Sequence, residues 1–246
     1  MKAKLYHKKS LKNLVLIVPI KNEKINVTLL TYNINILYSD VEIIFVYDTK
    51  SENSLSELKK LKKKFMINFI YSKNKGISGS INTALNSCVE NKLIGIALAD
   101  DLGVIYQLDT IYKKMFKLKN KKTVLTTTRY SKGGKRLHGS KPEHLLSFLA
   151  NLFFRLIYKT SDATTACRFT WKKDFYLLSK NINERSWAYN LVFITLAKKK
   201  KFKIIEVPII SIDRLKFGKS TFNLFSWIIK YLKVFFKSIK ILYFKN

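Results

Sequence analysis

Short apolar runs alternate with segments of helical spacing along this sequence, and this alternation constrains the fold more than any other feature. Unbroken apolar runs are typical of strands buried on both faces of a parallel sheet. Strands that alternate with helices form such a sheet with helices on both faces. The predicted strands cover residues 14–19, 41–47, 65–71, 93–99, 123–128 and 202–207, and the predicted helices cover residues 23–38, 56–64, 79–88, 109–119 and 144–159.

The size and composition of the chain fit one folded unit. The chain has 246 residues, of which 47% are hydrophobic, so it can build a sizeable core and is not a disordered chain. Only three Pro and eight Gly occur, and no linker rich in Ser, Gly or Pro separates two parts. We predict one α/β domain over residues 1–221 and a terminal helix over residues 222–246.

The formal net charge of +31 is extreme, and only six of the 47 basic residues are Arg. Part of this Lys excess is expected to be solvated surface. The alternative is attraction to a polyanion, either anionic lipid or nucleic acid. The chain has no recognised nucleic-acid-binding motif, so we predict no specific nucleic-acid partner. Cys88 and Cys167 form no disulfide framework, which favours a reducing compartment.

Ligands of parallel sheets bind beyond the carboxyl ends of the strands, so the segments that follow the predicted strands are the candidates for a site. These segments form an ordered series over residues 12–222. Its members are VPIKNE at 18–23, VYD at 46–48, NKGISG at 74–79, ADDL at 99–102, RY at 129–130 followed by Gly133 and Gly134, DAT at 162–164, EVP at 206–208, and Arg214 with GKS at 218–220.

This series resembles the family 2 glycosyltransferases of the GT-A fold, and within them the dolichyl- or polyprenyl-phosphate mannose and glucose synthases. The resemblance implies a Rossmann-like, mostly parallel sheet flanked by helices. It also implies inverting transfer of a hexose from a GDP- or UDP-sugar to a polyprenyl phosphate. Two alternatives remain. One is transfer to a sugar hydroxyl in cell-surface polysaccharide assembly, with Asp162 as the base, and the other is an inactive relative that binds nucleotide-sugar or membrane.

The resemblance also assigns the residues that bind the nucleotide-sugar. Asp48 follows a buried strand and would accept hydrogen bonds from the nucleobase or ribose, whereas Pro19 and Glu23 would line the base pocket. A turn-forming Asp and a helix-starting Glu are the structural alternatives. The full predicted donor set is Pro19, Glu23, Val46, Asp48, Gly79, Asp100 and Asp101.

The leaving nucleoside diphosphate carries negative charge that a divalent cation or basic side chains must stabilise. Asp101 is the predicted catalytic ligand of Mg²⁺ or Mn²⁺, because these cations prefer carboxylate and phosphate oxygens. Ala99 replaces the first Asp of the family motif, and Gly103 stands where relatives often carry a polar ligand. Either the phosphates and Asp101 hold the metal, or metal dependence is lost. A solvated turn is the alternative for Asp100 and Asp101.

Arg129 and Arg214 are the predicted catalytic cations, because a planar guanidinium binds phosphate through two hydrogen bonds as Lys does not. By resemblance, both would hold the diphosphate or the acceptor phosphate, together with Lys219 and Ser220. Thr221 occupies the position of the family's lysine. Surface salt bridges are the alternative for both arginines.

The segment 222–244 combines aromatic and aliphatic residues with a lysine stripe, which is typical of a helix lying in a membrane interface. We therefore predict a peripheral protein on the cytoplasmic side of a membrane, with an anionic membrane surface as partner. An ordinary docked terminal helix is the alternative. The helix at 144–159 is either a second interfacial element or a core helix. The stripe consists of Lys230, Lys233, Lys237 and Lys240.

Overall fold

The computed structural model describes residues 7–119, 121–137, 141–212 and 224–244. Its centre is a seven-stranded sheet in the order β10-β7-β9-β6-β2-β4-β5, and two small two-stranded sheets pair β1 with β3 and β8 with β11. The strands are β1 Lys9–Ser10, β2 Leu14–Pro19, β3 Tyr38–Ser39, β4 Glu42–Tyr47, β5 Ile67–Tyr71, β6 Leu93–Ile96, β7 Thr123–Thr128, β8 Lys135–Leu137, β9 Arg168–Trp171, β10 Lys203–Pro208 and β11 Ile210–Ile212.

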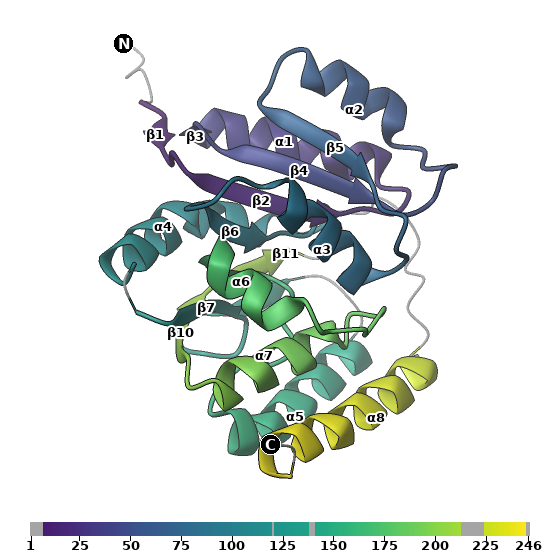
Figure 1. Cartoon of the computed structure of the whole chain (residues 1–246), viewed down its shortest axis with the longest axis vertical. Helices are drawn as coiled ribbons and strands as arrows, with labels where there is room; N and C mark the ends of the chain where they lie inside the picture. The colour runs from purple at the N-terminus through teal and green to yellow at the C-terminus, as the bar shows by residue number, and fades with distance from the viewer. Residues whose placement is uncertain (1–6, 120, 138–140, 213–223, 245–246) are drawn as a thin grey trace.

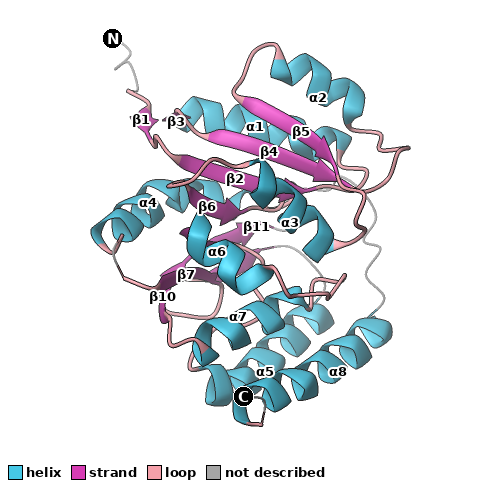
Figure 2. Ribbon diagram, viewed as in Figure 1, coloured by secondary structure: helices cyan, strands magenta, loops and turns pink. Residues whose placement is uncertain are grey.

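Helices cover both faces of this sheet, as the sequence predicts for an α/β fold (Figure 2). All strand pairs of the central sheet are parallel except those that β9 makes with β6 and β7. The helices are α1 Lys24–Leu37, α2 Leu55–Lys62, α3 Ile77–Ser87, α4 Leu108–Lys117, α5 Lys141–Tyr158, α6 Lys172–Ser179, α7 Tyr189–Lys199 and α8 Leu224–Tyr243, with a 3₁₀ turn η1 at Leu102–Gln107.

Alternation along each strand divides the core into two clusters, one on each face of the sheet. In β2, Leu14, Leu16 and Val18 pack into one cluster, whereas Val15 and Ile17 pack into the other. The first cluster also contains residues of α1, α2, α4 and η1. The second contains residues of α3, α5, α6, α7 and α8.

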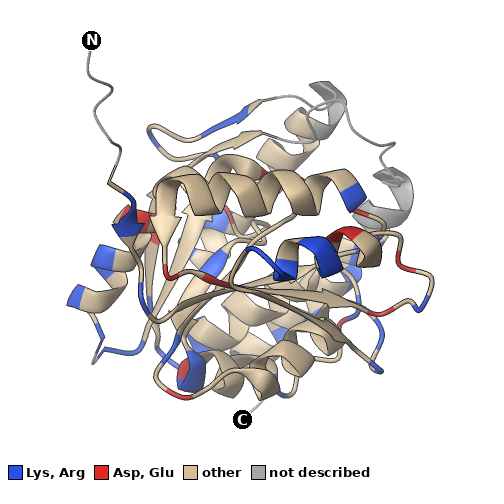
Figure 3. Ribbon diagram, turned by 90° about the horizontal axis from the view of Figure 1, so that it is seen from above, with Lys and Arg blue, Asp and Glu red and all other residues tan. Residues whose placement is uncertain are grey.

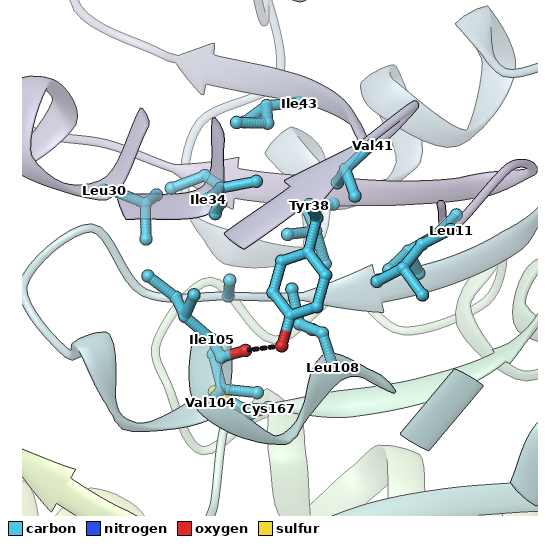
Figure 4. Packing of buried hydrophobic residues seen from close by; sticks show 14 of the residues in the cluster. Leu11, Leu30, Ile34, Tyr38, Val41, Ile43, Val104, Ile105, Leu108 and Cys167 are labelled. Carbon is cyan, nitrogen blue, oxygen red and sulfur yellow. Dashed lines mark hydrogen bonds between the residues drawn. The ribbon is translucent and has the colours of Figure 1, made fainter. Parts of the chain in front are cut away.

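Figure 4 shows how η1 closes the first cluster. The hydroxyl of Tyr38 donates a hydrogen bond of 2.8 Å to the backbone carbonyl of Ile105, among the buried side chains of Leu30, Ile34 and Leu108. This hydrogen bond gives a buried phenol the partner that it needs in an apolar environment. It also fixes η1, which directly follows Asp101.

The structure differs from the sequence prediction between the fifth and sixth predicted strands. The sequence predicts no element between residues 160 and 201, yet β9, α6 and α7 lie there. β9 has only four residues, all buried, and α7 carries β-branched residues within a continuous apolar run. Periodicity does not distinguish such short apolar runs. The predicted strand at 93–99 also ends early, at Ile96.

The helices α5 and α8 lie side by side at one end of the molecule, with α7 between them and the sheet (Figure 1). The ring of Phe235 on α8 packs against Phe153 and Phe154 of α5, at centroid distances of 5.2 and 5.1 Å. The predicted terminal helix is therefore docked on the domain through one face. Within the described ranges, no helix has the length and apolar character needed to cross a membrane.

Candidate functional site

The carboxyl ends of β2, β4 and β5 bring three loops together, at 20–23, 48–54 and 72–76. Backbone hydrogen bonds connect them, because the N–H of Ile20 donates to the carbonyl of Val46 and the N–H of Ser72 donates to the carbonyl of Tyr47. This is the edge where the sequence predicts the nucleotide-sugar. Pro19 and Glu23 lie there, half-buried. The side chain of Val46 does not line this edge, since it is completely buried in the core.

Asp48 connects the second of these loops to the third. Its Oδ2 accepts a hydrogen bond of 2.7 Å from the N–H of Gly76, which has a φ of +85°. Gly79 follows in the first turn of α3, where a Cβ would lie 2.2 Å from the carbonyl oxygen of Asn74. Gly79 therefore permits close packing of α3 on this loop, and its predicted role in donor binding stays a prediction.

Asp101 is buried and uses both carboxylate oxygens inside the protein. Oδ1 accepts hydrogen bonds from the N–H groups of Gly103, at 2.9 Å, and Ile212, at 3.0 Å. Oδ2 accepts one from the hydroxyl of Ser211 at 2.6 Å. These bonds attach β11 to the end of the central strand β6. Asp101 therefore holds the backbone of the site, in addition to its predicted role as a metal ligand.

The protein oxygens that the structure describes near Asp101 are too few to hold a metal ion by themselves. They fit a metal ion that is also bound by the diphosphate of the substrate. In the described part of the chain, no group of three His, Cys, Asp or Glu side chains could hold a metal ion. Ala99 is buried where the family motif has its first carboxylate, and Asp100 is half-buried beside Asp101. Since Mg²⁺ and Mn²⁺ take about six oxygen ligands, most of them must come from phosphate and water.

Arg129 stands at the end of β7, and its guanidinium forms a paired contact with Asp162. Nε donates to Oδ2 at 2.7 Å, and Nη2 donates to Oδ1 at 3.0 Å. Nη2 also donates to the hydroxyl of Thr164. Asp162 has 0% side-chain exposure and Arg129 has 16%. The fork predicted to bind phosphate is thus engaged by Asp162, and both oxygens of that carboxylate are occupied by Arg129.

A cavity of about 350 Å³ opens beside this ion pair. Arg129, Arg136 and His144 line it with basic side chains, and Leu145 and Phe148 of α5 line it with apolar ones. Tyr130 completes the lining and donates a hydrogen bond from its hydroxyl to Ser147. The lining of the cavity therefore combines basic and apolar side chains.

Sequence reasoning missed several residues of this region. Arg136 follows the Gly133–Gly134 turn in a loop predicted to be basic, and His144 has no spacing typical of a metal site. Neither observation indicates that the two residues line the same cavity. Arg168 is buried and donates to the carbonyl oxygens of Ala163 and Thr165, which holds the chain next to Asp162. Burial lowers the pKa of Arg168 to about 10, so it stays cationic at neutral pH.

The remaining predicted site residues, Arg214, Lys219 and Ser220, lie outside the described residues. β11 ends at Ile212, directly before this segment, and Asp101 binds that end. The predicted roles of these three residues in acceptor-phosphate binding stay predictions.

Comparison with known proteins decides the family. The model of glycosyl transferase family 2 matches residues 15–178, which is more than half of the chain and includes the donor edge, Asp101 and the Arg129–Asp162 pair. The chain belongs to glycosyl transferase family 2. The family and the glycosyltransferases of similar structure confirm the predicted GT-A fold. The protein is a glycosyltransferase.

Solved structures of glycosyltransferases share the fold of this family 2 member. Glucosyl-3-phosphoglycerate synthase from Mycobacterium tuberculosis, in complex with Mn²⁺, UDP and glucosyl-3-phosphoglycerate, matches with a TM-score of 0.67 at 8% identity over 93% of this chain and 79% of that chain. The mannosyltransferase PcManGT from Pyrobaculum calidifontis, with GDP-Man and Mn²⁺, matches with a TM-score of 0.60 at 14% identity over 93% and 64%. TarS from S. aureus matches with a TM-score of 0.57 at 18% identity over 82% and 60%. At these identities the likeness concerns the fold.

Proposed function

We propose that this family 2 glycosyltransferase moves a hexose from a GDP- or UDP-sugar to a polyprenyl phosphate, with inversion, at the cytoplasmic face of a membrane. The cavity beside Arg129 carries the proposal. Its basic residues suit a phosphate group, and Leu145 and Phe148 continue from them onto the exposed apolar face of α5. A polyprenyl phosphate has this same polarity, with a charged head and an apolar chain.

Support for the donor comes from the strand ends and from proteins of the same fold. The three loops at β2, β4 and β5 form the edge that binds ligands in parallel sheets. The similar synthase was solved with UDP-glucose and Mn²⁺, and the similar mannosyltransferase with GDP-Man and Mn²⁺. We propose that Asp101 and Asp100 bind Mg²⁺ or Mn²⁺ together with the diphosphate, where the cation would supply positive charge to the leaving group.

Phosphate as the nucleophile agrees with the protonation chemistry of the site. A phosphate monoester is already ionised near pH 7, so its oxygen needs no strong general base. Asp162 is fully buried and both of its oxygens accept hydrogen bonds from Arg129, so neither oxygen is presented to a sugar hydroxyl. The acceptor that fits this site is therefore one that arrives as an anion.

The outer faces of α5 and α8 support membrane binding. On α5, Leu145, Leu149, Leu152 and Leu156 follow helical spacing and are exposed, with Leu156 at 78%. Burying a large apolar side chain stabilises by about 1.5–3 kcal/mol, so such a surface favours an apolar partner. The exposed apolar residues of the neighbouring helix are Ile229, Leu232, Phe236 and Tyr243, and its lysines 230, 233, 237 and 240 are exposed beside them.

Transfer of label into lipid tests the proposal. The purified chain is incubated with vesicles containing a polyprenyl phosphate and with radiolabelled UDP- and GDP-sugars, and label is counted in the organic phase. We expect one donor to give lipid-soluble label and Arg136→Ala to reduce the rate at least about tenfold, since it removes a charged contact to phosphate. Arg155→Ala is the matched control, because Arg155 is exposed on α5 and lies outside the cavity lining.

Two results would contradict the proposal. One is that no donor gives lipid-soluble label while a water-soluble glycan becomes labelled, which would favour transfer to a sugar hydroxyl. The other is an equal loss of activity in the Arg136→Ala and Arg155→Ala variants, which would show that the acceptor does not bind in the cavity.

A further inference from the structure

Glu52 is a carboxylate that is 5% exposed and lies in the loop between β4 and α2. The N–H of Asn22 donates to both of its oxygens, at 2.8 Å each. The N–H of Ser54 also donates to Oε1, at 3.1 Å, and so does the hydroxyl of Ser54, at 2.6 Å. Glu52 therefore joins its own loop to the loop that follows β2.

Ser54 extends this connection by one residue. Its buried hydroxyl donates to Glu52 and accepts a hydrogen bond of 3.0 Å from the N–H of Glu23. Two consecutive backbone N–H groups, of Asn22 and Glu23, are thus held by the 48–54 loop. Asn22 has a φ of +58°, in the left-handed region that Asn adopts more readily than most non-glycine residues.

The loops that Glu52 joins are the two that carry the predicted nucleoside contacts. Pro19 and Glu23 lie close to Asn22 in the sequence, at the end of β2. Asp48 lies in the other loop, together with Glu52. Hydrogen bonds to a buried ionised group are stronger than neutral ones, and leaving such a group without partners is costly. The Glu52 contacts therefore favour one spacing between these loops.

We propose that Glu52 is a positioning residue for the donor nucleotide, which sets the distance between the 19–23 and 48–54 loops through the backbone of Asn22 and Glu23. The role rests on the nucleotide-sugar part of the proposed function. It does not depend on the acceptor. Glu52 acts through the two loops, and its own oxygens are occupied by protein donors.

Substitution of Glu52 by Gln tests this role, because the amide keeps the size of the side chain and replaces one acceptor oxygen by a donor. We expect the affinities for UDP and GDP, measured by calorimetry with the full chain, to fall about tenfold for the nucleotide that the wild type binds. In the transfer assay, the KM for the donor rises by a similar factor, while kcat and the acceptor KM change less than about twofold.

Glu57→Gln is the matched control, since Glu57 lies on the adjacent α2 and pairs with exposed Lys60 at the surface. Ser54→Ala is a second variant, which removes the hydroxyl contacts to Glu23 and Glu52 but keeps both hydrogen bonds from Asn22 to Glu52, and it is expected to weaken nucleotide binding by a smaller factor. If Glu52→Gln does not fold, this variant decides the question by the same measurements.

Unchanged nucleotide affinity in the folded variants, with only a lowered melting temperature, would overturn the positioning role and leave Glu52 a structural residue. A wild-type chain that binds neither UDP nor GDP would overturn the donor proposal and this role together. Nucleotide binding without transfer to lipid would contradict only the proposed acceptor, so the failures are distinguishable.

Discussion

Three carboxylates are buried in the described part of the chain, and each one accepts hydrogen bonds from other segments. Glu52 holds the loop after β2, Asp101 holds β11, and Asp162 holds Arg129 at the end of β7. A buried carboxylate is stable when its oxygens are satisfied in this way. Glu52 and Asp101 therefore fix the positions of loops, and Asp162 fixes the position of the Arg129 guanidinium.

Asp162→Ala should destabilise the protein strongly. The substitution leaves Arg129 partly buried without its partner, and breaking a buried ion pair from one side costs about 3–5 kcal/mol. The free energy of unfolding from urea titration measures this. Glu90→Ala is the control, because Glu90 is 70% exposed in its pair with Lys172 and should change the value by less than about 1 kcal/mol. Similar small losses in both variants would show that the Arg129–Asp162 pair contributes little.

At the scale of elements, the sequence predicts most strands and helices of the central sheet, including β7, β10 and α5, but it misses β9, α6 and α7. The strands β2, β4 and β5 are unbroken apolar runs bounded by polar loops, so periodicity and composition identify them. β9 enters the sheet from the second half of the chain and runs antiparallel, which no local pattern indicates. The contacts of Glu52 are equally non-local, because they join residues 30 positions apart.

The apolar pattern of a helix also does not show which of its faces is buried. The apolar spacing of α5 fits a core helix and an interfacial helix equally, and only the packing shows that the side containing Phe154 and Tyr158 is buried while Leu149 and Leu152 are exposed. The family motifs do not show which way the side chains of their residues face. Val46 turned out to be core, and the fork of Arg129 faces Asp162.

Gly79→Ala should weaken the packing of α3. A Cβ would lie 2.2 Å from the backbone carbonyl of Asn74, and backbone cannot move aside as a flexible side chain can. We expect a loss of about 1–3 kcal/mol in unfolding free energy, in spite of the better helix propensity of Ala. Asn86→Ala, at an exposed position of the same helix, should be neutral or slightly stabilising. A stabilised Gly79→Ala variant would mean that the loop at 74–76 adapts.

At the scale of the whole molecule, positive charge is spread widely, whereas exposed apolar surface is concentrated. Figure 3 shows Lys and Arg on several helices and loops, with few acidic residues among them. The net charge of +31 therefore attracts anionic surfaces without selecting one face. We propose that the outer sides of α5 and α8 select the face that binds a membrane, because both helices carry large exposed apolar residues and lie side by side at one end of the molecule (Figure 1).

Binding to vesicles should accordingly depend on α5 more than on charge alone. We expect the double variant Leu149→Asp and Leu152→Asp to bind phosphatidylglycerol-containing vesicles at least about tenfold more weakly in sedimentation, and 0.5 M salt to weaken the wild type only in part. The control is Ile36→Asp with Val89→Asp, two exposed apolar residues that lie elsewhere. Equal binding by both double variants would contradict α5 as the membrane-binding surface.

The position of β9 has a consequence for biosynthesis. During translation, β2, β4, β5 and β6 emerge first and pair with one another without any later segment. Within the sheet, β7 joins this group only through β9, whose residues 168–171 are made after β7. These four strands can thus assemble on the nascent chain, whereas Arg129 acquires its place beside them only when β9 is inserted. Asp101 acquires its partners Ser211 and Ile212 later still, because both belong to β11, which is made after β9 and β10.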